Sequence, residues 1–431
     1  MKKRFDMVVV GFALFAMFFG AGNLIFPPYL GLSAGPEWLK GFVFYSIADI
    51  GVALFGIFAM IRTDGDMDSL TGRVGKIPAL LINSAAVLCI GPIFAIPRTG
   101  ATSFEIGVQP IFENFNSIIF SLIYFGIVFA LTIRPSKVVD IIGKILTPLL
   151  LILLVYLIIR GVMTPIGSIS KAPLESNVVA NGLIAGYQTL DAFAAMIFGI
   201  IIIQAVKDKG YTKGGPNSKA KVVIGASVVA AVCLIVVYGG LTYLGATVST
   251  TFDMEINQST LLITIVNMVL GKTGATILGI IVILACLTTA IGLTSATAAY
   301  FEKITSGKLK YSVVVVIVTV LSILISNIGL SAIIAFAVPV LLFLYPIVLT
   351  VIFTSFASGI IKNDNTIRGA VLFAAITSLF TVLHSYGISF FPIEKMPLFA
   401  SGLNWIIPAV IGGLLGTLIK TGKKETEENV A

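Results

Sequence analysis

The stretch from Phe18 to Pro28 combines residue types that seldom share one apolar helix. Gly20 and Gly22 bracket an alanine, Asn23 follows, and a Pro pair closes the stretch. Glycine weakens a helix, and proline removes a backbone donor. Backbone groups freed at membrane depth must line a cavity or be buried in protein. The pattern therefore predicts a broken helix whose N–H and C=O groups bind a polar ligand. The alternative is a kinked but intact packing helix, because small residues are common at membrane helix contacts.

A second candidate site surrounds Asp191, in the sequence GYQTLDAFAAMIFG. An apolar run follows this carboxylate, and an intramembrane carboxylate typically marks the path of an ion or a substrate. The alternative is that the helix begins later and leaves Asp191 in an outer loop. Asp191 lies five apolar spans after the first stretch, so the two helices run in opposite directions. Two interrupted helices in corresponding halves indicate an inverted-repeat transporter with a midplane site.

The third candidate is dense in hydroxyl groups, in the sequence LTTAIGLTSAT from Leu287 to Thr297. Hydroxyl and carbonyl oxygens suit a hard cation such as sodium. The alternative is that these Ser and Thr side chains bond back to their own helix. Sodium is the only metal expected, since one His and Cys89, Cys233 and Cys286 in separate apolar runs make no other metal or catalytic set.

The composition defines the class of protein that must position these groups. Of the 431 residues, 57% are hydrophobic and only 11% are charged. So few charges cannot cover the surface of a water-soluble globule of this size. The composition excludes a soluble enzyme, a nucleic-acid-binding protein and a disordered chain, and predicts a polytopic membrane protein.

Twelve apolar runs are long enough to cross a bilayer, and they lack the alternation of barrel strands, so we expect transmembrane helices. They begin near Phe5, Trp38, Ile77, Phe115, Val138, Asn181, Val222, Thr273, Tyr311, Leu330, Thr366 and Ser401. The loops between them are short. We expect a single transmembrane domain over residues 1–431, with repeat one at about 5–163, repeat two at about 181–355 and two extra helices at about 366–420.

The basic residues predict the orientation. With the N-terminus in the cytoplasm, 21 Lys and Arg residues fall on the cytoplasmic side and 6 outside, out of 28. This bias places both termini inside. The basic run from Lys207 to Lys221 is then a cytoplasmic loop and not a nucleic-acid patch. The first apolar run has no signal-peptidase site, so we expect a retained first helix.

Four motifs in order resemble one known family. They are GFALFAMFFGAGNLIFPPYLG, GPIFAIPRTGATSFE, GYQTLDAFAAMIFG and ACLTTAIGLTSATAAYFE. Together they are similar to the bacterial branched-chain amino acid:cation symporters of the BrnQ type, over nearly the whole chain. The resemblance implies an all-α LeuT-type fold of 5+5 inverted repeats with broken helices 1 and 6. It also implies uptake of leucine, isoleucine and valine across the bacterial cytoplasmic membrane, driven by sodium or protons.

The resemblance also implies a substrate site. It puts the amides of Ala21 and Gly22 on the substrate carboxylate and the carbonyl of Phe18 against its ammonium group, and it includes Asn23 among the substrate-binding residues. Asp191 stands where sodium-coupled relatives carry a hydroxyl, which suggests a stronger cation ligand or a protonatable group. Apolar walls for a branched side chain are expected from Phe19, Phe193, Phe198 and Ile93.

By the same resemblance, one sodium ion has hydroxyl ligands from Thr294 and Ser295. Carbonyl ligands would come from Ala16, Phe19 and Ile291. No further cofactor and no obligatory protein partner are expected.

Three other ionisable residues have open interpretations. Lys144 is a second candidate proton site, in addition to Asp191. The alternative is a lysine whose side chain reaches toward the inner membrane surface. Arg98 and Glu105 are seven residues apart and share a helix face, so they are either an outer gate or a structural pair.

Two other functional classes have specific requirements. A channel needs a continuous hydrophilic file or rings of charge, whereas the polar sites here are few and scattered. An intramembrane enzyme needs a nucleophile–base pair or a metal centre. The sequence therefore predicts a secondary symporter that is not an enzyme.

Overall fold

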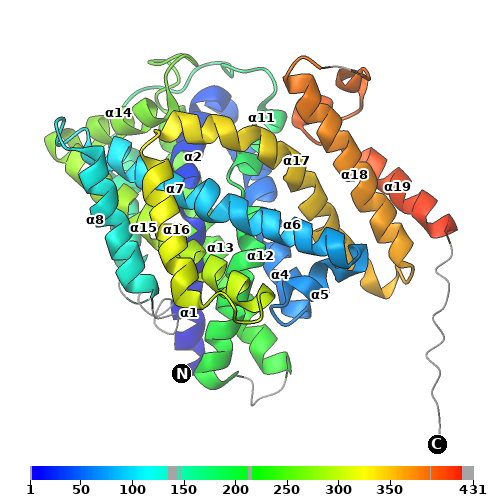
Figure 1. The fold of residues 1–431 in the computed structure, drawn as a ribbon. Helices are drawn as coiled ribbons and strands as arrows, with labels where there is room; N and C mark the ends of the chain where they lie inside the picture. The colour runs from blue at the N-terminus through cyan, green and yellow to red at the C-terminus, as the bar shows by residue number, and fades with distance from the viewer. Residues whose placement is uncertain (1, 134–143, 145–146, 212–215, 389, 420–431) are drawn as a thin grey trace, which may run out of the picture. The chain divides into compact units, whose positions relative to one another are not determined.

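The computed structural model describes residues 2–133, 144, 147–211, 216–388 and 390–419, and every regular element within them is helical (Figure 1). The elements that carry the candidate groups are α1 (Lys2–Phe18), α2 (Ala21–Ala34), α3 (Trp38–Ser46), η2 (Ile47–Gly51), α4 (Val52–Arg62), α7 (Ala95–Thr102), η5 (Ser103–Val108), α11 (Val178–Gln188), α12 (Asp191–Val206), α13 (Pro216–Ala246) and α15 (Gly274–Ile304). The remaining main helices are α5 (Met67–Thr71), α6 (Lys76–Leu88), α8 (Ser117–Thr132), α10 (Thr147–Met163), α14 (Gln258–Leu270), α16 (Tyr311–Ser326), α17 (Leu330–Phe356), α18 (Asp364–Ser385) and α19 (Ile406–Leu418).

Seven helical segments in the described chain are long and apolar enough to cross a membrane, by length and composition, and five apolar helices are shorter. The all-α membrane class is therefore confirmed, while the count of twelve spans stays a prediction. One long segment, Ala21–Arg62, contains the second half of the first expected span and the whole second span. The expected start of the fifth span, near Val138, lies outside the described residues.

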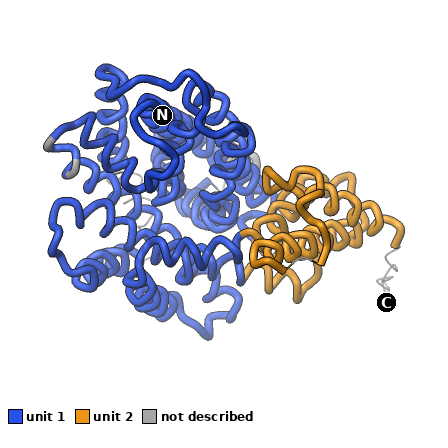
Figure 2. The backbone as a smooth tube through the Cα atoms, turned by 90° about the horizontal axis from the view of Figure 1, so that it is seen from above, with its two compact units in different colours: residues 1–66, 85–341 blue, residues 67–84, 342–431 orange. Residues whose placement is uncertain are grey.

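The chain divides into two compact units, residues 1–66 with 85–341 and residues 67–84 with 342–431 (Figure 2). In the second unit α18 packs along α19, and the two helices approach closely because Gly369 and Gly412 meet backbone to backbone. The expected repeat boundaries stay a prediction.

All the candidate functional groups belong to the first unit. There α1 and α2 pack on α13, α11 packs on α3, α12 packs on α4, and α15 contacts α1, α7 and α12. The helices at the centre are almost wholly buried: α2 from Ala21 to Pro28, and α12 from Asp191 to Gly199. Helices that are apolar on every side and contain small residues can pack closely in this way.

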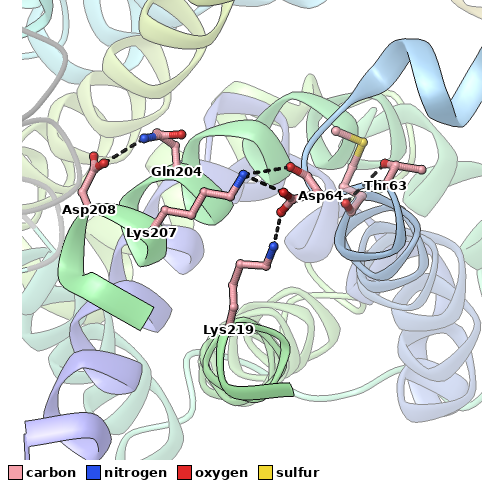
Figure 3. A network of polar contacts seen from close by, with 7 residues as sticks. Thr63, Asp64, Gln204, Lys207, Asp208 and Lys219 are labelled. Atoms are coloured by element: carbon pink, nitrogen blue, oxygen red, sulfur yellow. Dashed lines mark hydrogen bonds and ion pairs between the residues drawn. The ribbon is translucent and has the colours of Figure 1, made fainter. Parts of the chain in front are cut away.

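Acidic residues at one end of the first unit contact lysines of segments that the charge bias assigns to the cytoplasm. Asp64 accepts a hydrogen bond from Lys207 at 2.9 Å and also pairs with Lys219 (Figure 3). Asp66 pairs with Lys303. Asp6, near the start of α1, accepts a hydrogen bond from the Tyr211 hydroxyl at 2.8 Å.

Segments assigned to the outer side also contact one another. The amide of Ser170 donates to Ser249 Oγ at 2.8 Å, and the amide of Leu174 donates to the carbonyl of Ser33 at 2.9 Å. Tyr29 donates to the carbonyl of Met254 at 3.0 Å. In the structure, loops that the charge bias assigns to the same side of the membrane thus contact one another. Which group faces the cytoplasm stays a prediction.

Candidate functional site: two helix breaks that face one cavity

The first expected interruption is present in the structure. Helix α1 ends at Phe18, Gly20 is extended, and α2 begins at Ala21. Gly20 lies close to α15, since a Cβ atom there would be 3.1 Å from the Thr289 hydroxyl. The first amides of a helix have no partner within it. The start of α2 can therefore offer hydrogen-bond donors to an anionic group.

The second expected interruption separates α11 from α12 at Thr189 and Leu190. Leu190 has a positive φ of 71°, a left-handed conformation that is strained for a branched side chain. Such strain persists where the surrounding structure holds it, and it is typical of functional sites. The break makes Asp191 the first residue of α12 and leaves its side chain only 4% exposed.

The two breaks are joined by hydrogen bonds between side chains. Asn23 Nδ2 donates to Asp191 Oδ2 at 3.0 Å and contacts the Tyr238 hydroxyl oxygen at 2.7 Å. All three residues are buried, and Tyr238 comes from α13. The structure therefore brings together Asn23 and Asp191, which lie 168 positions apart in the chain.

Asp49 is a site residue that the sequence analysis missed. It lies in η2, is 1% exposed, and accepts a hydrogen bond from Thr189 Oγ1 at 2.9 Å. Its carboxyl group also lies within hydrogen-bonding reach of Asp191. The signal was available, because Asp49 is a lone carboxylate in the apolar run that begins at Trp38.

Arg98 and Glu105, the expected outer gate, contact different helices. Arg98 faces α2, where a Cβ atom on Gly22 would be 3.2 Å from its guanidinium group, and its charge acts on Asp191. Glu105 Oε1 accepts a hydrogen bond from the amide of Leu330 at 2.8 Å. The π-helix η5 widens the turn that contains Glu105, so the seven-residue spacing does not keep the two side chains on one face. Their role as a gate stays a prediction.

A small cavity of about 30 Å³ lies between the two breaks. Its lining includes both ends of the first interruption, the second interruption, and side chains of α7 and α15: Phe18, Ala21, Asn23, Arg98, Thr99, Thr189, Leu190, Asp191, Phe198, Thr289 and Leu293. This volume suits one or two water molecules. An amino acid therefore needs the walls to move apart.

The expected apolar walls are only partly on this cavity. Phe18 and Phe198 line it and meet edge to face at 5.1 Å. Phe193 is fully buried in α12 and Phe19 stacks on Tyr238, but neither lines the cavity. Ile93 is 38% exposed and also lies off the lining.

The hydroxyl groups of α15 fall into two sets, and the expected sodium site stays a prediction. The Thr288 hydroxyl lies 2.8 Å from the carbonyl oxygen of Ala16, and the Thr289 hydroxyl lies 3.0 Å from that of Met17. Thr294 Oγ1 and Ser295 Oγ are buried without a hydrogen-bond partner. The side chain of Ile291 is fully buried on the same helix.

Lys144, the other candidate proton site, has an exposed side chain. The residues on both sides of it lie outside the described part of the chain, and its role stays a prediction.

Comparisons with known proteins identify the family. The profile of the branched-chain amino acid transport protein family matches residues 3–423. This chain belongs to that family. The expected resemblance is thereby confirmed, and the protein is a multi-pass membrane transporter and not an enzyme.

Named family members are similar over almost their full length. The branched-chain amino acid permease BraB of Bacillus subtilis is 36% identical, with 96% of this chain and 95% of BraB aligned. The permease BrnQ of the same organism is also 36% identical, with 97% and 98% aligned.

Solved structures with low sequence identity share the fold. A Na+-coupled sialic acid symporter superposes with a TM-score of 0.64 at 13% identity, over 97% of this chain and 91% of the symporter. Mhp1, a nucleobase-cation-symport-1 family transporter, gives 0.62 at 13% identity, over 96% and 92%. The chain therefore shares its overall fold with these two proteins.

Proposed function

We propose that this chain is a secondary symporter that imports leucine, isoleucine and valine together with sodium by alternating access. The observation that carries the proposal is the pair of helix breaks at Phe19–Gly20 and Thr189–Leu190, whose ends line one cavity. The names of BraB and BrnQ support the substrate class. The architecture proposed is twelve spans, 5+5 inverted repeats and two extra helices.

A zwitterion fits the polar groups around the cavity. The substrate carboxylate would accept from the amides of Ala21 and Gly22, with Arg98 as a nearby positive charge. The ammonium group would lie against the Phe18 carbonyl and Asp191. A half-helix N-terminus favours an anion, and unwound carbonyls favour a cation.

The branched side chain would enter the apolar part of the cavity, between Phe18 and Phe198. A methylene group changes binding in such a pocket by only about 1–3 kcal/mol. We therefore expect leucine, isoleucine and valine to compete for one site.

The proposed sodium site lies on α15, with hydroxyl ligands from Thr294 and Ser295. The carbonyls of Ala16, Phe19 and Ile291 would complete it. Support comes from the two buried hydroxyls without a partner, because an unsatisfied buried polar group is unfavourable and gains from a cation. The carbonyl of Ala16 now faces Thr288, so sodium binding would require a small shift of that end of α1.

We further propose that the protein lies in the bacterial cytoplasmic membrane with both termini inside. The lysine contacts of Asp6, Asp64 and Asp66 would then close the cytoplasmic side. Their release, coupled to closure of the outer side, would open the cavity inward. Coupling requires sodium and substrate to favour the same conformation.

The alternative is proton-coupled symport with Asp191 or Lys144 as the proton carrier. The specific observation in its favour is the burial of Asp191 beside a second carboxyl group, Asp49.

Leucine uptake into proteoliposomes tests the proposal, with sodium and pH gradients imposed one at a time. Sodium-driven accumulation above equilibrium, inhibited by isoleucine and valine, is the expected result. Accumulation that follows the pH gradient alone would replace sodium by the proton. Downhill, non-saturable flux would contradict symport.

A further inference from the structure

Asp49 and Asp191 are two buried carboxyl groups from elements distant in sequence, and the transport scheme above gives no role to the first. Among the described residues, Asp6, Asp49 and Asp191 are the buried acidic side chains. Asp6 has the Lys209 ammonium at 3.9 Å and the Tyr211 hydroxyl at 2.8 Å. Asp49 and Asp191 instead face each other.

The contacts of the pair hold each carboxyl group by one oxygen. Asn23 Nδ2 donates to Asp191 Oδ2 at 3.0 Å, and Thr189 Oγ1 contacts Asp49 Oδ1 at 2.9 Å. The Tyr45 hydroxyl lies beside the Asp49 carboxyl group, whose second oxygen is enclosed without a geometrically ideal hydrogen-bond partner. The pair therefore retains buried acceptor capacity at its centre.

The helices packed around the two carboxyl groups contribute the other titratable groups that face them. Helix α7 contributes Arg98, and α15 contributes Cys286 beside it. Helices α3 and α13 contribute the phenols of Tyr45 and Tyr238, which stack edge to face at 5.6 Å. The set thus has two acids and one cation, while the phenols and the thiol are neutral. Two ionised carboxylates would leave one buried negative charge uncompensated, at a large free-energy cost.

We propose that Asp49 and Asp191 share one proton, and that the protein holds this proton while it binds the amino acid. When the substrate ammonium reaches Asp191, the proton resides on Asp49 and leaves Asp191 ionised. The step breaks an O–H bond on one carboxyl group and forms one on the other. Asp49 is then neutral, Asp191 carries one negative charge and Arg98 one positive charge, so with the neutral zwitterion the site has no net charge. The link to the amino acid rests on the proposed function, whereas the shared proton does not.

Binding of leucine to the purified full chain, measured at saturating sodium and different pH values, tests the link. The pH range is one in which free leucine keeps its ammonium charge. Affinity of the wild type should fall about tenfold per pH unit once the shared proton is lost. Asp49→Asn should remove this slope, because asparagine stays neutral. The control variant Asp253→Asn removes an exposed acid and should keep the pH slope of the wild type.

Infrared difference spectroscopy of the protein without substrate tests the proton itself. The wild type should give a carboxylic-acid C=O band that shifts in D₂O and disappears at high pH. Asp49→Asn and Asp191→Asn should both lose the band, and Asp253→Asn should keep it. Absence of the band from the wild type overturns the proposal even if no variant folds. An unchanged pH slope in Asp49→Asn overturns the link.

The two proposals fail separately. If leucine is accumulated but the infrared band is absent, the shared-proton proposal is wrong and the symporter proposal stands. A band that depends on both acids, in a protein that does not accumulate leucine, removes the symporter and keeps the shared proton.

Discussion

Asp191 is held at the start of α12 by contacts from three directions. Asn23 donates to it from α2, Asp49 faces it from η2, and Arg98 acts on it from α7. A carboxylate in this position can bind an ammonium group or a proton, but it cannot be solvated by bulk water. The cost of burial makes its function dependent on these neighbours.

Substitution of Asp191 by asparagine should abolish accumulation of leucine. The amide keeps the shape and a contact with Asn23, but it cannot neutralise an ammonium group. A lost charged hydrogen bond is worth about 1.5–3 kcal/mol, which corresponds to about a tenfold to hundredfold loss of affinity. Uptake assays in proteoliposomes measure this, with Asp253→Asn as the matched control. Concentrative uptake that survives in Asp191→Asn would exclude Asp191 as the coupling group.

Thr294→Ala and Ser295→Ala should each lower the apparent affinity for sodium by about tenfold, through loss of one hydroxyl ligand. The sodium dependence of leucine uptake measures the effect. Thr377→Ala is the matched control, because the Thr377 hydroxyl bonds to the carbonyl of Phe373 in its own helix. Sodium curves identical to the wild type would remove both residues from the ion site.

At the scale of elements, glycines of α11 bring Asp49 next to Thr189. A Cβ atom on Gly186 would lie 2.6 Å from the carbonyl oxygen of Tyr45, and one on Gly182 would lie 2.5 Å from that of Gly41. Helix α11 therefore packs against the backbone of α3 and η2. This close contact carries Asp49 to the second helix break.

Gly186→Ala should destabilise the protein by about 1–3 kcal/mol, since the added methyl group overlaps backbone that cannot rotate away. It should also weaken leucine binding by moving Asp49. Thermal unfolding in detergent and leucine binding measure the two effects. In Gly126→Ala the methyl group meets no atom within 4 Å, so that variant should unfold at or slightly above the wild-type temperature. Equal stability of the two variants would contradict the packing argument.

The lysine contacts of Asp64 join the loop after α4 to Lys207, which directly follows α12, and to Lys219 of α13 (Figure 3). Lys219 and Lys207 hold the pKa of Asp64 below its ordinary value. A lowered pKa contributes stability that is present above the ordinary value, about 3.9, and is lost as the pH falls toward the folded value. Because Asp64 is largely exposed, the contribution is small.

Asp64→Asn should lower the unfolding temperature at neutral pH, and the difference from the wild type should shrink below about pH 4. Asn also accepts the left-handed backbone of Asp64, whose φ is 56°, so the variant isolates the charge. Glu37→Gln removes an exposed charge that pairs with Lys40 on the next turn, and should have almost no effect. A pH-independent difference for Asp64→Asn would contradict the electrostatic origin.

At the scale of the whole molecule, the orientation can be tested by labelling. Cys89, Cys233 and Cys286 are replaced first, and one cysteine is then placed at Thr250 or Ser306, in loops at opposite ends. A membrane-impermeant maleimide should label position 250 on intact cells and position 306 only after permeabilisation. The reverse pattern would invert the proposed topology.

Part of the site was predictable because its signals are local. The Gly and Pro residues of the first break and the carboxylate of the second are exceptions within apolar runs, and each exception is costly in a membrane. The partners were not predictable in this way. Tyr238 is an ordinary residue of an apolar helix, and Thr189 has no distinctive pattern of its own; their roles come from distances across the fold.

The sequence by itself determined the membrane class, the family and the positions of the two helix breaks, because these follow from composition and from local backbone chemistry. The tertiary structure alone decided that Asp49 faces Asp191. It also decided that Arg98 lies against Gly22, whereas Glu105 accepts from the amide of Leu330. Finally, it decided that the Thr288 hydroxyl donates to the carbonyl of Ala16. Those contacts depend on helix packing and on a π-turn, where one residue of register changes the neighbour that a side chain meets.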